Sequence, residues 1–479
     1  MTGVKSLYVG RKTDTYQTTG NSSNTTANTP VLLSRNEYNE IGQLIKKRLH
    51  GTGSPLSFAK DVSYTYNERG WMKTINAPSL FSDTLTYNEP ASGVVPQYNG
   101  NISRQGWAPG KYYIYKYDPL NRLTSAIGGA GNNEELGYDL MGNIKDLRRK
   151  QNSLLIDQLK YTYAGNRLTS VLDTNTSTSA SFQLRGTPNY SYDIDGRMTG
   201  RSNSSGSYPA NNLTGIVYNN LNLPQTLSAN GTVVNYVYDG TGNTLRKTVG
   251  STVSNDYIGG THYEADVFAF AQTGEGRVVK TGLSADPVYS YEYTISDHLG
   301  NGRVYFDIFG GAARKIEETD YYAFGMSIAV SQSGIANGYQ YNGKERQDQE
   351  KLFDYGARLY DPVIARWNVI DPKAEEGRRF SPYIYGFNDP IRFIDPDGMA
   401  QESWSQYVER SDRDLGIMAG GYETLNEKDP DQPILQWLFK LFGIGPGGSS
   451  DTSEEGDVQS NVRAMVSSQN VEVSAIVDK

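Results

Sequence analysis

One phrase recurs along the first half of the chain: a tyrosine, then Asn or Asp, then a short run with Gly or Asn, then strand-forming residues. The copies are YNEIGQLIKK, YNERGWMKTI, YDPLNRLTSAI, YDLMGNIKDL, YAGNRLTSVL, YDIDGRMTGR, YNNLNLPQTL and YDGTGNTLRK, beginning at Tyr38, Tyr66, Tyr117, Tyr138, Tyr163, Tyr192, Tyr218 and Tyr238. Most copies start 20–29 residues after the previous one, with one gap of 51 residues. A period of this length predicts a structure of stacked repeats.

Each copy predicts one β-hairpin. The residues before the turn alternate in character, as in SYTYN at 63–67 and NYVYD at 235–239, which is typical of a strand that ends in Tyr. The Asn or Asp that follows, with Gly or Asn two to four residues later, predicts a turn closed by a side-chain hydrogen bond and a left-handed residue. A second strand follows, such as RLTSVL at 167–172. We therefore expect a mainly β fold with few helices, in which tyrosine rings pack against the next copy.

The residue counts agree with this fold and exclude several kinds of site. Gly contributes 51 residues and Tyr 36, which suits short strands joined by tight turns. The chain contains no Cys, so disulfides, thiolate metal sites and Cys nucleophiles are excluded. Its three histidines, His50, His262 and His298, lie far apart in sequence. We therefore expect no metal site and no cofactor.

Charge and hydropathy limit the partners of the chain. The first residues have no apolar stretch typical of a signal peptide, and no run approaches the length of a membrane-spanning segment. The first repeat begins with little before it, which suggests a piece of a longer protein. Residues 400–479 hold 14 Asp or Glu and six Lys or Arg, so the whole net charge of −8 lies there. Such a segment repels phosphate backbones, and we expect no nucleic-acid binding.

The repeated phrases resemble the YD repeats of the Rhs family, in which a long β-sheet strip winds into a hollow shell. Residues 293–399 are similar to the Rhs repeat-associated core domain of polymorphic toxins, in its Bacteroidetes-like form. The motifs that carry this resemblance are YTISDHLGNGRVYFD (293–307), TDYYAFGM (319–326), GYQYNGKERQDQ (338–349), FDYGARLYDPVIARWNVIDPKAEE (353–376) and SPYIYGFNDPIRFIDPDGM (381–399). The resemblance implies a β strip that curls into a partial shell closed by the core domain, with a small, partly helical tail.

This resemblance predicts four regions. They are a flexible lead over 1–29, a YD-repeat strip over 30–292, the core domain over 293–399, and a variable acidic segment over 400–479. In the family, the core domain plugs the shell and cleaves the chain just after a DPxGL-type motif.

The motif here is Asp395-Pro396-Asp397-Gly398, with Met399 in place of Leu, so the implied cut lies between Met399 and Ala400. The upstream motif begins at Asp371-Pro372, with Ala374 in place of Gly. The resemblance implies Asp371 and Asp395 as catalytic residues and Arg366, of the ARW motif, as the arginine that positions one of them. Pro372 and Pro396 would hold the direction of the chain, and Gly398 would let the backbone approach the two carboxyls.

Cleavage by two carboxyls requires one of them to be protonated and the other ionised. The ionised one takes a proton from water, and the neutral one polarises the carbonyl of Met399. The enzyme activity implied is an autocatalytic aspartyl peptidase that acts only on its own chain. Without the resemblance, the same residues also predict ordinary Asp-Pro turns, and Ala374 leaves an uncut joint as an alternative.

Two functions remain open on the sequence. In the first, a secreted or surface-located shell encapsulates residues 400–479 as toxin-like cargo and releases them by self-cleavage, with an immunity protein and a secretion machinery as partners. Within that cargo, an apolar helix is expected over 434–444, too short to span a membrane. In the second, the repeats bind cell-surface glycans or partner cells, and the joint is vestigial.

Overall fold

The protein is described from a computed structural model that defines residues 2–6, 11–18, 30–89, 93–175, 187–203, 212–251, 253–281 and 288–403. Within these ranges the chain is almost entirely antiparallel β-sheet, and its only helices are two three-residue 3₁₀ turns. Twenty-eight strands form one sheet, in which each strand pairs with the next along the chain. The expectation of a mainly β strip with few helices is confirmed. We call this 28-stranded sheet the strip.

The first half of the strip comprises β1 (Thr2–Ser6), β2 (Lys12–Gln17), β3 (Val31–Tyr38), β4 (Leu44–Thr52), β5 (Ser57–Tyr66), β6 (Met72–Ala77), β7 (Phe81–Thr86), β8 (Arg104–Ala108), β9 (Lys111–Tyr117), β10 (Leu123–Gly128), β11 (Asn133–Tyr138), β12 (Ile144–Gln151), β13 (Leu154–Ala164) and β14 (Arg167–Asp173). The second half comprises β15 (Asn189–Tyr192), β16 (Met198–Ser202), β17 (Leu213–Tyr218), β18 (Pro224–Ala229), β19 (Thr232–Tyr238), β20 (Thr244–Val249), β21 (Val253–Ile258), β22 (Thr261–Glu264), β23 (Val267–Thr273), β24 (Gly276–Thr281), β25 (Val288–Ser296), β26 (Gly302–Phe309), β27 (Ala312–Tyr321) and β28 (Ser327–Gln332).

The repeated tyrosines bind each hairpin to the one before it. Tyr66, at the end of β5, donates its hydroxyl to the backbone oxygen of Leu44 at the start of β4, at 2.9 Å. The same bond recurs along the strip, from Tyr117 to Ile102, Tyr138 to Leu123, Tyr163 to Ile144, Tyr218 to Met198 and Tyr238 to Pro224. A half-buried tyrosine needs such a partner, because an unbonded buried hydroxyl costs free energy.

Where Asn or Asp follows the tyrosine, its side chain closes the turn as the sequence predicts; the copy at Tyr163 has Ala164 at this position. The Oδ1 atom of Asp118 accepts hydrogen bonds from the backbone N–H groups of Leu120 and Arg122, at 2.9 and 3.0 Å. Asp139 and Asn219 make the same pair of bonds in their own turns. Each of these turns also contains a left-handed residue: Asn121, Gly142 and Asn222 have φ values of 62°, 84° and 61°. The predicted turn chemistry is confirmed.

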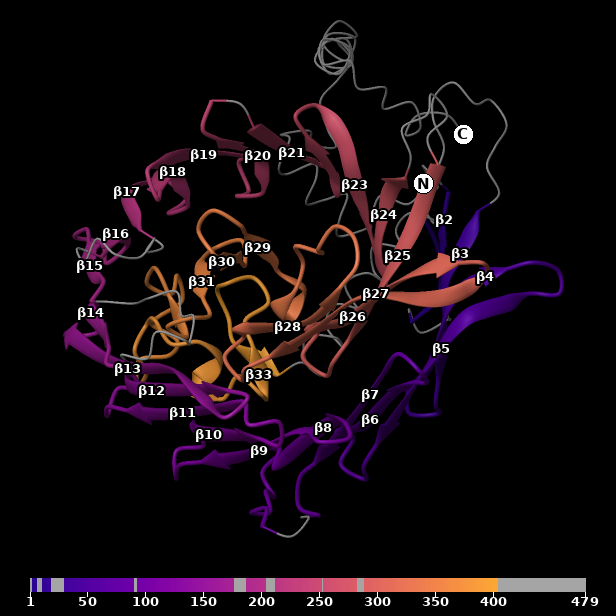
Figure 1. Cartoon of the computed structure of the whole chain (residues 1–479), viewed down its shortest axis with the longest axis horizontal. Coiled ribbons are helices and arrows are strands. Elements are labelled where there is room, and N and C mark those ends of the chain that lie inside the picture. Colours follow the sequence, from indigo (N-terminus) through magenta and orange to yellow (C-terminus); the bar gives the residue numbers. More distant parts are fainter. Residues whose placement is uncertain are drawn as a thin grey trace, which may run out of the picture. The chain divides into compact units, whose positions relative to one another are not determined.

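The strip curves round so that β3–β6, near its beginning, pack against β25 and β26, near its end (Figure 1). The apolar side chains of the first strands in this contact are Leu33, Leu49, Val62 and Ile75, and those of β25 and β26 are Tyr293, Ile295, Val304 and Phe306. Lys47, on β4, pairs with Glu275, just before β24, at 2.8 Å. Closure therefore buries apolar side chains from strands that lie more than 200 residues apart in sequence.

Residues 337–403, which we call the plug segment, lie inside the curve of the strip (Figure 1). They form two small sheets, of β29 (Glu345–Gln347), β30 (Leu352–Asp354), β31 (Leu359–Asp361) and β32 (Arg366–Trp367), and of β33 (Phe393–Ile394) and β34 (Glu402–Ser403). The 3₁₀ turns are η1 (Tyr341–Gly343) and η2 (Gly386–Asn388).

Aromatic rings and buried charges join the plug segment to the strip. Tyr192 of β15 contacts Tyr383, and Tyr321 of β27 contacts Tyr341, each at a centroid distance of 5.9 Å. The fully buried Arg149 of β12 donates to the backbone oxygen of Val363 at 2.7 Å, and it also pairs with Glu134 and Asp157. The plug segment is therefore part of the main core and not a separate layer.

Two expected boundaries differ from the structure. Residues 1–29, expected as a flexible lead, contribute β1 and β2, and β2 pairs with β3. The boundary expected at 292/293 falls inside β25, so the strip continues into the predicted core domain. The predicted helix over 434–444 lies outside the described residues.

Candidate functional site

A single arginine brings Asp371 and Asp395 together. The Nη2 atom of Arg358 donates to Oδ2 of Asp371 at 2.9 Å and to Oδ2 of Asp395 at 2.6 Å. Arg358 directly precedes β31, Asp371 follows β32 by four residues, and Asp395 follows β33 directly. The short strands of the plug segment thus bring two carboxyls, 24 residues apart in sequence, to one nitrogen of Arg358.

Arg358 is held by a ring contact and by several hydrogen bonds. Its guanidinium lies 4.2 Å from the ring centroid of Trp367, and its side chain is fully buried. Its Nε atom donates to the backbone oxygen of Gly398 at 2.6 Å. Its remaining nitrogen, Nη1, has no hydrogen-bond partner in the described part of the chain. Arg358 therefore holds both carboxyls and the chain next to the predicted cut, and keeps one donor free.

The predicted cut lies against Asp395. The backbone N–H of Ala400 donates to Oδ1 of Asp395 at 3.1 Å. The pairing of β34 with β33 continues directly after this contact, with Ile394 opposite Glu402. Gly398 has a φ of 77°, and a Cβ atom there would lie 3.0 Å from the backbone nitrogen of Arg358. The close approach of the backbone therefore requires glycine at this position.

The environments of the two carboxyls differ. The Asp395 side chain is fully buried, whereas Asp371 keeps 13% of its side chain exposed. Burial raises the pKa of Asp395; Arg358 opposes this shift, and Asp371 adds to it. A buried carboxyl with a raised pKa beside a more exposed carboxyl is the asymmetry that acid–base chemistry by an aspartate pair needs.

Arg366 is not at this site. Its Nη1 atom donates to Oδ1 of Asn143 at 3.1 Å, and its Nη2 atom donates to the backbone oxygen of Asn166. The arginine between the aspartates is Arg358, which the sequence reasoning missed because the ARW motif directed attention to Arg366. One signal was available: Arg358 stands in FDYGARLYDP, a stretch rich in buried residues, where a charged side chain needs a buried partner.

Asp371 also serves a turn. The backbone N–H of Lys373 donates to its Oδ1 atom at 2.8 Å, and the N–H of Ala374 donates to its backbone oxygen at 3.1 Å. The turn that follows Asp371-Pro372 thus forms with Ala374 in place of Gly. The turn interpretation and the paired-carboxyl interpretation are compatible at this residue.

Neither a metal site nor a membrane-spanning helix is found among the described residues. No group of three or more His, Asp or Glu side chains among them could hold a metal ion. No helix among them is long and apolar enough to span a membrane.

The chain is similar to short parts of a toxin subunit, a nuclease and a surface protein. No protein-family model matches it. It is 38% identical over 93 residues to toxin subunit YenC2 of Yersinia entomophaga, covering 19% of this chain and 9% of that one. It is 27% identical over 271 residues to the tRNA3(Ser)-specific nuclease WapA of Bacillus spizizenii, covering 50% of this chain and 11% of that one. It is 33% identical over 110 residues to Salivary gland surface protein 1 of Aedes aegypti, covering 22% of this chain and 3% of that one.

The fold matches part of a solved toxin structure. The Tc holotoxin pore of Photorhabdus luminescens superposes with a TM-score of 0.52 at 16% identity, covering 81% of this chain and 21% of that one. The chain therefore shares its fold with part of a Tc toxin and is similar in sequence to parts of toxin subunit YenC2 and of the nuclease WapA. It spans only 3–11% of the length of the three relatives named above.

Proposed function

We propose that this chain is a Rhs-type shell protein that cleaves itself after Met399. The cut frees residues 400–479, a toxin-like segment, for interbacterial competition or toxin delivery outside the producing cell. The observation that carries the proposal is the hydrogen bond from the Ala400 N–H to the buried Asp395, whose carboxyl shares Arg358 with Asp371. The likeness to Tc, YenC and WapA toxins supports the same class of function.

The proposed reaction adds one water molecule to the peptide bond between Met399 and Ala400. Asp371, the more exposed carboxyl, accepts a proton from the water as its oxygen attacks the Met399 carbonyl. Arg358 Nη1 supplies a donor for the negative charge that develops on the carbonyl oxygen. Asp395 then gives its proton to the nitrogen of Ala400, the carbon–nitrogen bond breaks, and the products are a Met399 carboxylate and an Ala400 amine.

The test is intact mass spectrometry of purified protein under denaturing conditions. We expect two pieces, 1–399 and 400–479, from the wild type. Asp371→Asn and Asp395→Asn should each leave one uncut chain. Asp397→Asn is the matched control, because asparagine keeps the oxygen that accepts the Met399 N–H. An uncut wild type would refute the proposal, and cutting that survives both single substitutions would refute the aspartyl mechanism.

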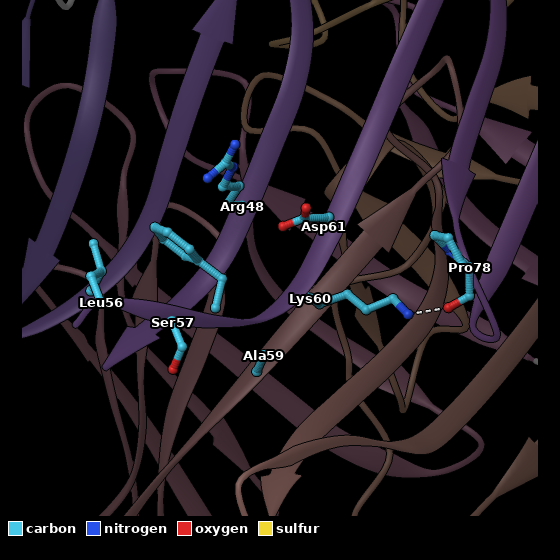
Figure 2. A pocket seen from close by; sticks show the side chains of 8 residues that line it. Arg48, Leu56, Ser57, Ala59, Lys60, Asp61 and Pro78 are labelled. Carbon is cyan, nitrogen blue, oxygen red and sulfur yellow. Dashed lines mark hydrogen bonds between the residues drawn. The ribbon is translucent and has the colours of Figure 1, made fainter. Parts of the chain in front are cut away.

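The alternative function, glycan binding by the repeats, has less support in the structure. The aromatic side chains with large exposure among the described residues are Tyr98 and Phe309, which are far apart in sequence. A surface hollow of about 390 Å³ lies over β4 and β5, and Figure 2 shows that Arg48, Lys60 and Asp61 line it. Its one aromatic ring, Phe58, already has the guanidinium groups of Arg35 and Arg48 5.8 and 5.7 Å from its centroid. Among the described tyrosines, Tyr98 alone is exposed, so few rings are available to stack on a sugar.

A further inference from the structure

Arg366 is a buried cation without a carboxylate partner. Only 3% of the residue is exposed. Its hydrogen bonds go to the neutral Asn143 and Asn166, and its guanidinium lies 5.0 and 4.6 Å from the rings of Tyr163 and Tyr383. In the described ranges it forms no ion pair with Asp or Glu. A buried charge of this kind is costly unless a counter-charge accompanies it.

A small enclosed cavity lies beside this arginine, between the strip and the plug segment. Tyr190 and Tyr192 of β15 line it from the strip, and Arg366 and Trp367 of β32 line it from the plug segment. The volume open to the centre of a water-sized sphere is about 10 Å³. The cavity therefore has room for one particle about the size of a water molecule or a small ion.

Three residues that line the cavity each carry a buried hydrogen-bond donor with no partner among the described residues. These donors are the hydroxyl of Tyr190, Nε of Arg366 and Nε1 of Trp367. All three residues are more than nine-tenths buried. Arginine and tryptophan nitrogens can donate but cannot accept hydrogen bonds. An unpaired buried donor is costly, so three around one cavity indicate an absent acceptor.

Two acceptors on the same wall already have partners. The Asp361 carboxylate accepts from Arg201 through Oδ2 and from the backbone N–H of Val363 through Oδ1, the latter at 2.9 Å. The side-chain oxygen of Asn368 accepts from the backbone N–H of Leu359 at 3.2 Å. The one carboxylate on the wall therefore pairs with Arg201, and Arg366 has no counter-charge of its own there.

We propose that this cavity binds one small monovalent anion, such as chloride, through Tyr190, Arg366 and Trp367. An anion accepts from all three donors and balances the charge of Arg366. A water molecule would accept from two of them and would need acceptors for its own hydrogens. Tyr190 belongs to the strip, whereas Arg366 and Trp367 belong to the plug segment. The anion therefore joins the strip to the plug segment and stabilises their contact. The proposal does not rest on self-cleavage, although Trp367 also stacks on Arg358 of the candidate cleavage site.

The test combines crystallography with unfolding. Crystals grown in bromide should show an anomalous peak bounded by Tyr190, Arg366 and Trp367. At constant ionic strength, replacing gluconate with chloride should raise the urea midpoint of unfolding. For a site half-filled at about 1 mM, 100 mM chloride raises the folding equilibrium constant about 100-fold.

Matched variants separate this site from general salt effects. Tyr190→Phe and Trp367→Phe each remove one donor and keep a ring, so both should lose most of the response to chloride. Tyr238→Phe, which removes a hydroxyl bonded to Pro224 on another part of the strip, should keep it. A wild type with no bromide peak, or a response to chloride that is equal in all four proteins, would overturn the proposal in favour of a water-filled cavity.

Discussion

The sharpest stability prediction concerns Asp389, a buried carboxyl without a partner. Asp389 follows η2 and is 1% exposed. Neither of its carboxylate oxygens has a hydrogen-bond partner in the described residues. Burial raises the pKa of Asp389 from its ordinary 3.8 to about 8, while the charge of Arg392 and the nearby backbone N–H of Ile391 oppose the shift. At neutral pH the folded chain therefore keeps a proton on Asp389 that the unfolded chain releases.

The sign and size of the effect follow from this difference. The folded state binds one more proton than the unfolded state between the two pKa values, so the contribution of Asp389 to stability is complete below pH 3.8 and is lost as the pH rises through about 8. The loss is about 1.4 kcal/mol per pH unit within that window. From pH 5.5 to 7.5 it amounts to on the order of 2–3 kcal/mol. Asp389→Asn removes the titration, so the variant should gain stability over the wild type by this amount across the interval.

The assay is urea unfolding followed by fluorescence at pH 5.5, 6.5 and 7.5. Both proteins should carry Asp371→Asn, so that cleavage does not differ between them. Burial also raises the pKa values of Asp157 and Glu345 to about 7. Their contributions are common to both proteins and cancel in the comparison. Asp195→Asn is the control, because that side chain is 62% exposed. Parallel pH dependence in the wild type and in Asp389→Asn would refute the reasoning.

Two further predictions concern the contacts that build the fold, and urea unfolding measures both. Tyr218→Phe removes the hydroxyl that donates to the Met198 oxygen at 2.7 Å and should lower the free energy of unfolding by about 1 kcal/mol. Tyr98→Phe, on an exposed ring, should change the free energy of unfolding little. If Tyr218→Phe and Tyr98→Phe lowered it equally, the hydroxyl bonds between hairpins would contribute nothing to stability. Gly196→Ala should cost more than Gly231→Ala. Both glycines have a left-handed φ, but a Cβ at Gly196 would lie 2.4 Å from Ile370, whereas nothing lies within 4 Å at Gly231. An equal cost would show that the contact between this turn and the plug segment can move aside.

The hairpins were predictable from sequence because their determinants are local. In the turns of Asp118, Asp139 and Asn219 the side chain accepts from backbone N–H groups two and four residues later. The left-handed position falls on Gly or Asn for a steric reason that is visible in the sequence. The pairing of each strand with the next follows from the tight turns. The series of tyrosine phrases therefore predicted the strip without any tertiary information.

The candidate site was predictable only in part. The resemblance pointed to Asp371 and Asp395, and the structure places them on one guanidinium. The resemblance did not distinguish Arg358 from Arg366. Both are buried arginines in aromatic stretches, and their partners lie elsewhere in the chain. Asp389 likewise stands in an ordinary Asn-Asp-Pro turn sequence, yet the fold buries it.

The sequence by itself thus determined the repeating hairpin, its turn chemistry and the mainly β class, all of which depend on residues within a few positions of one another. Only the tertiary structure decided where the strip closes, where the plug segment lies, which arginine meets the two aspartates and which carboxyl loses its contact with water. The physical reason is that burial and charge pairing depend on contacts between residues up to hundreds of positions apart. In the pairing of Lys47 with Glu275, for example, neither residue's neighbours in sequence indicate the other.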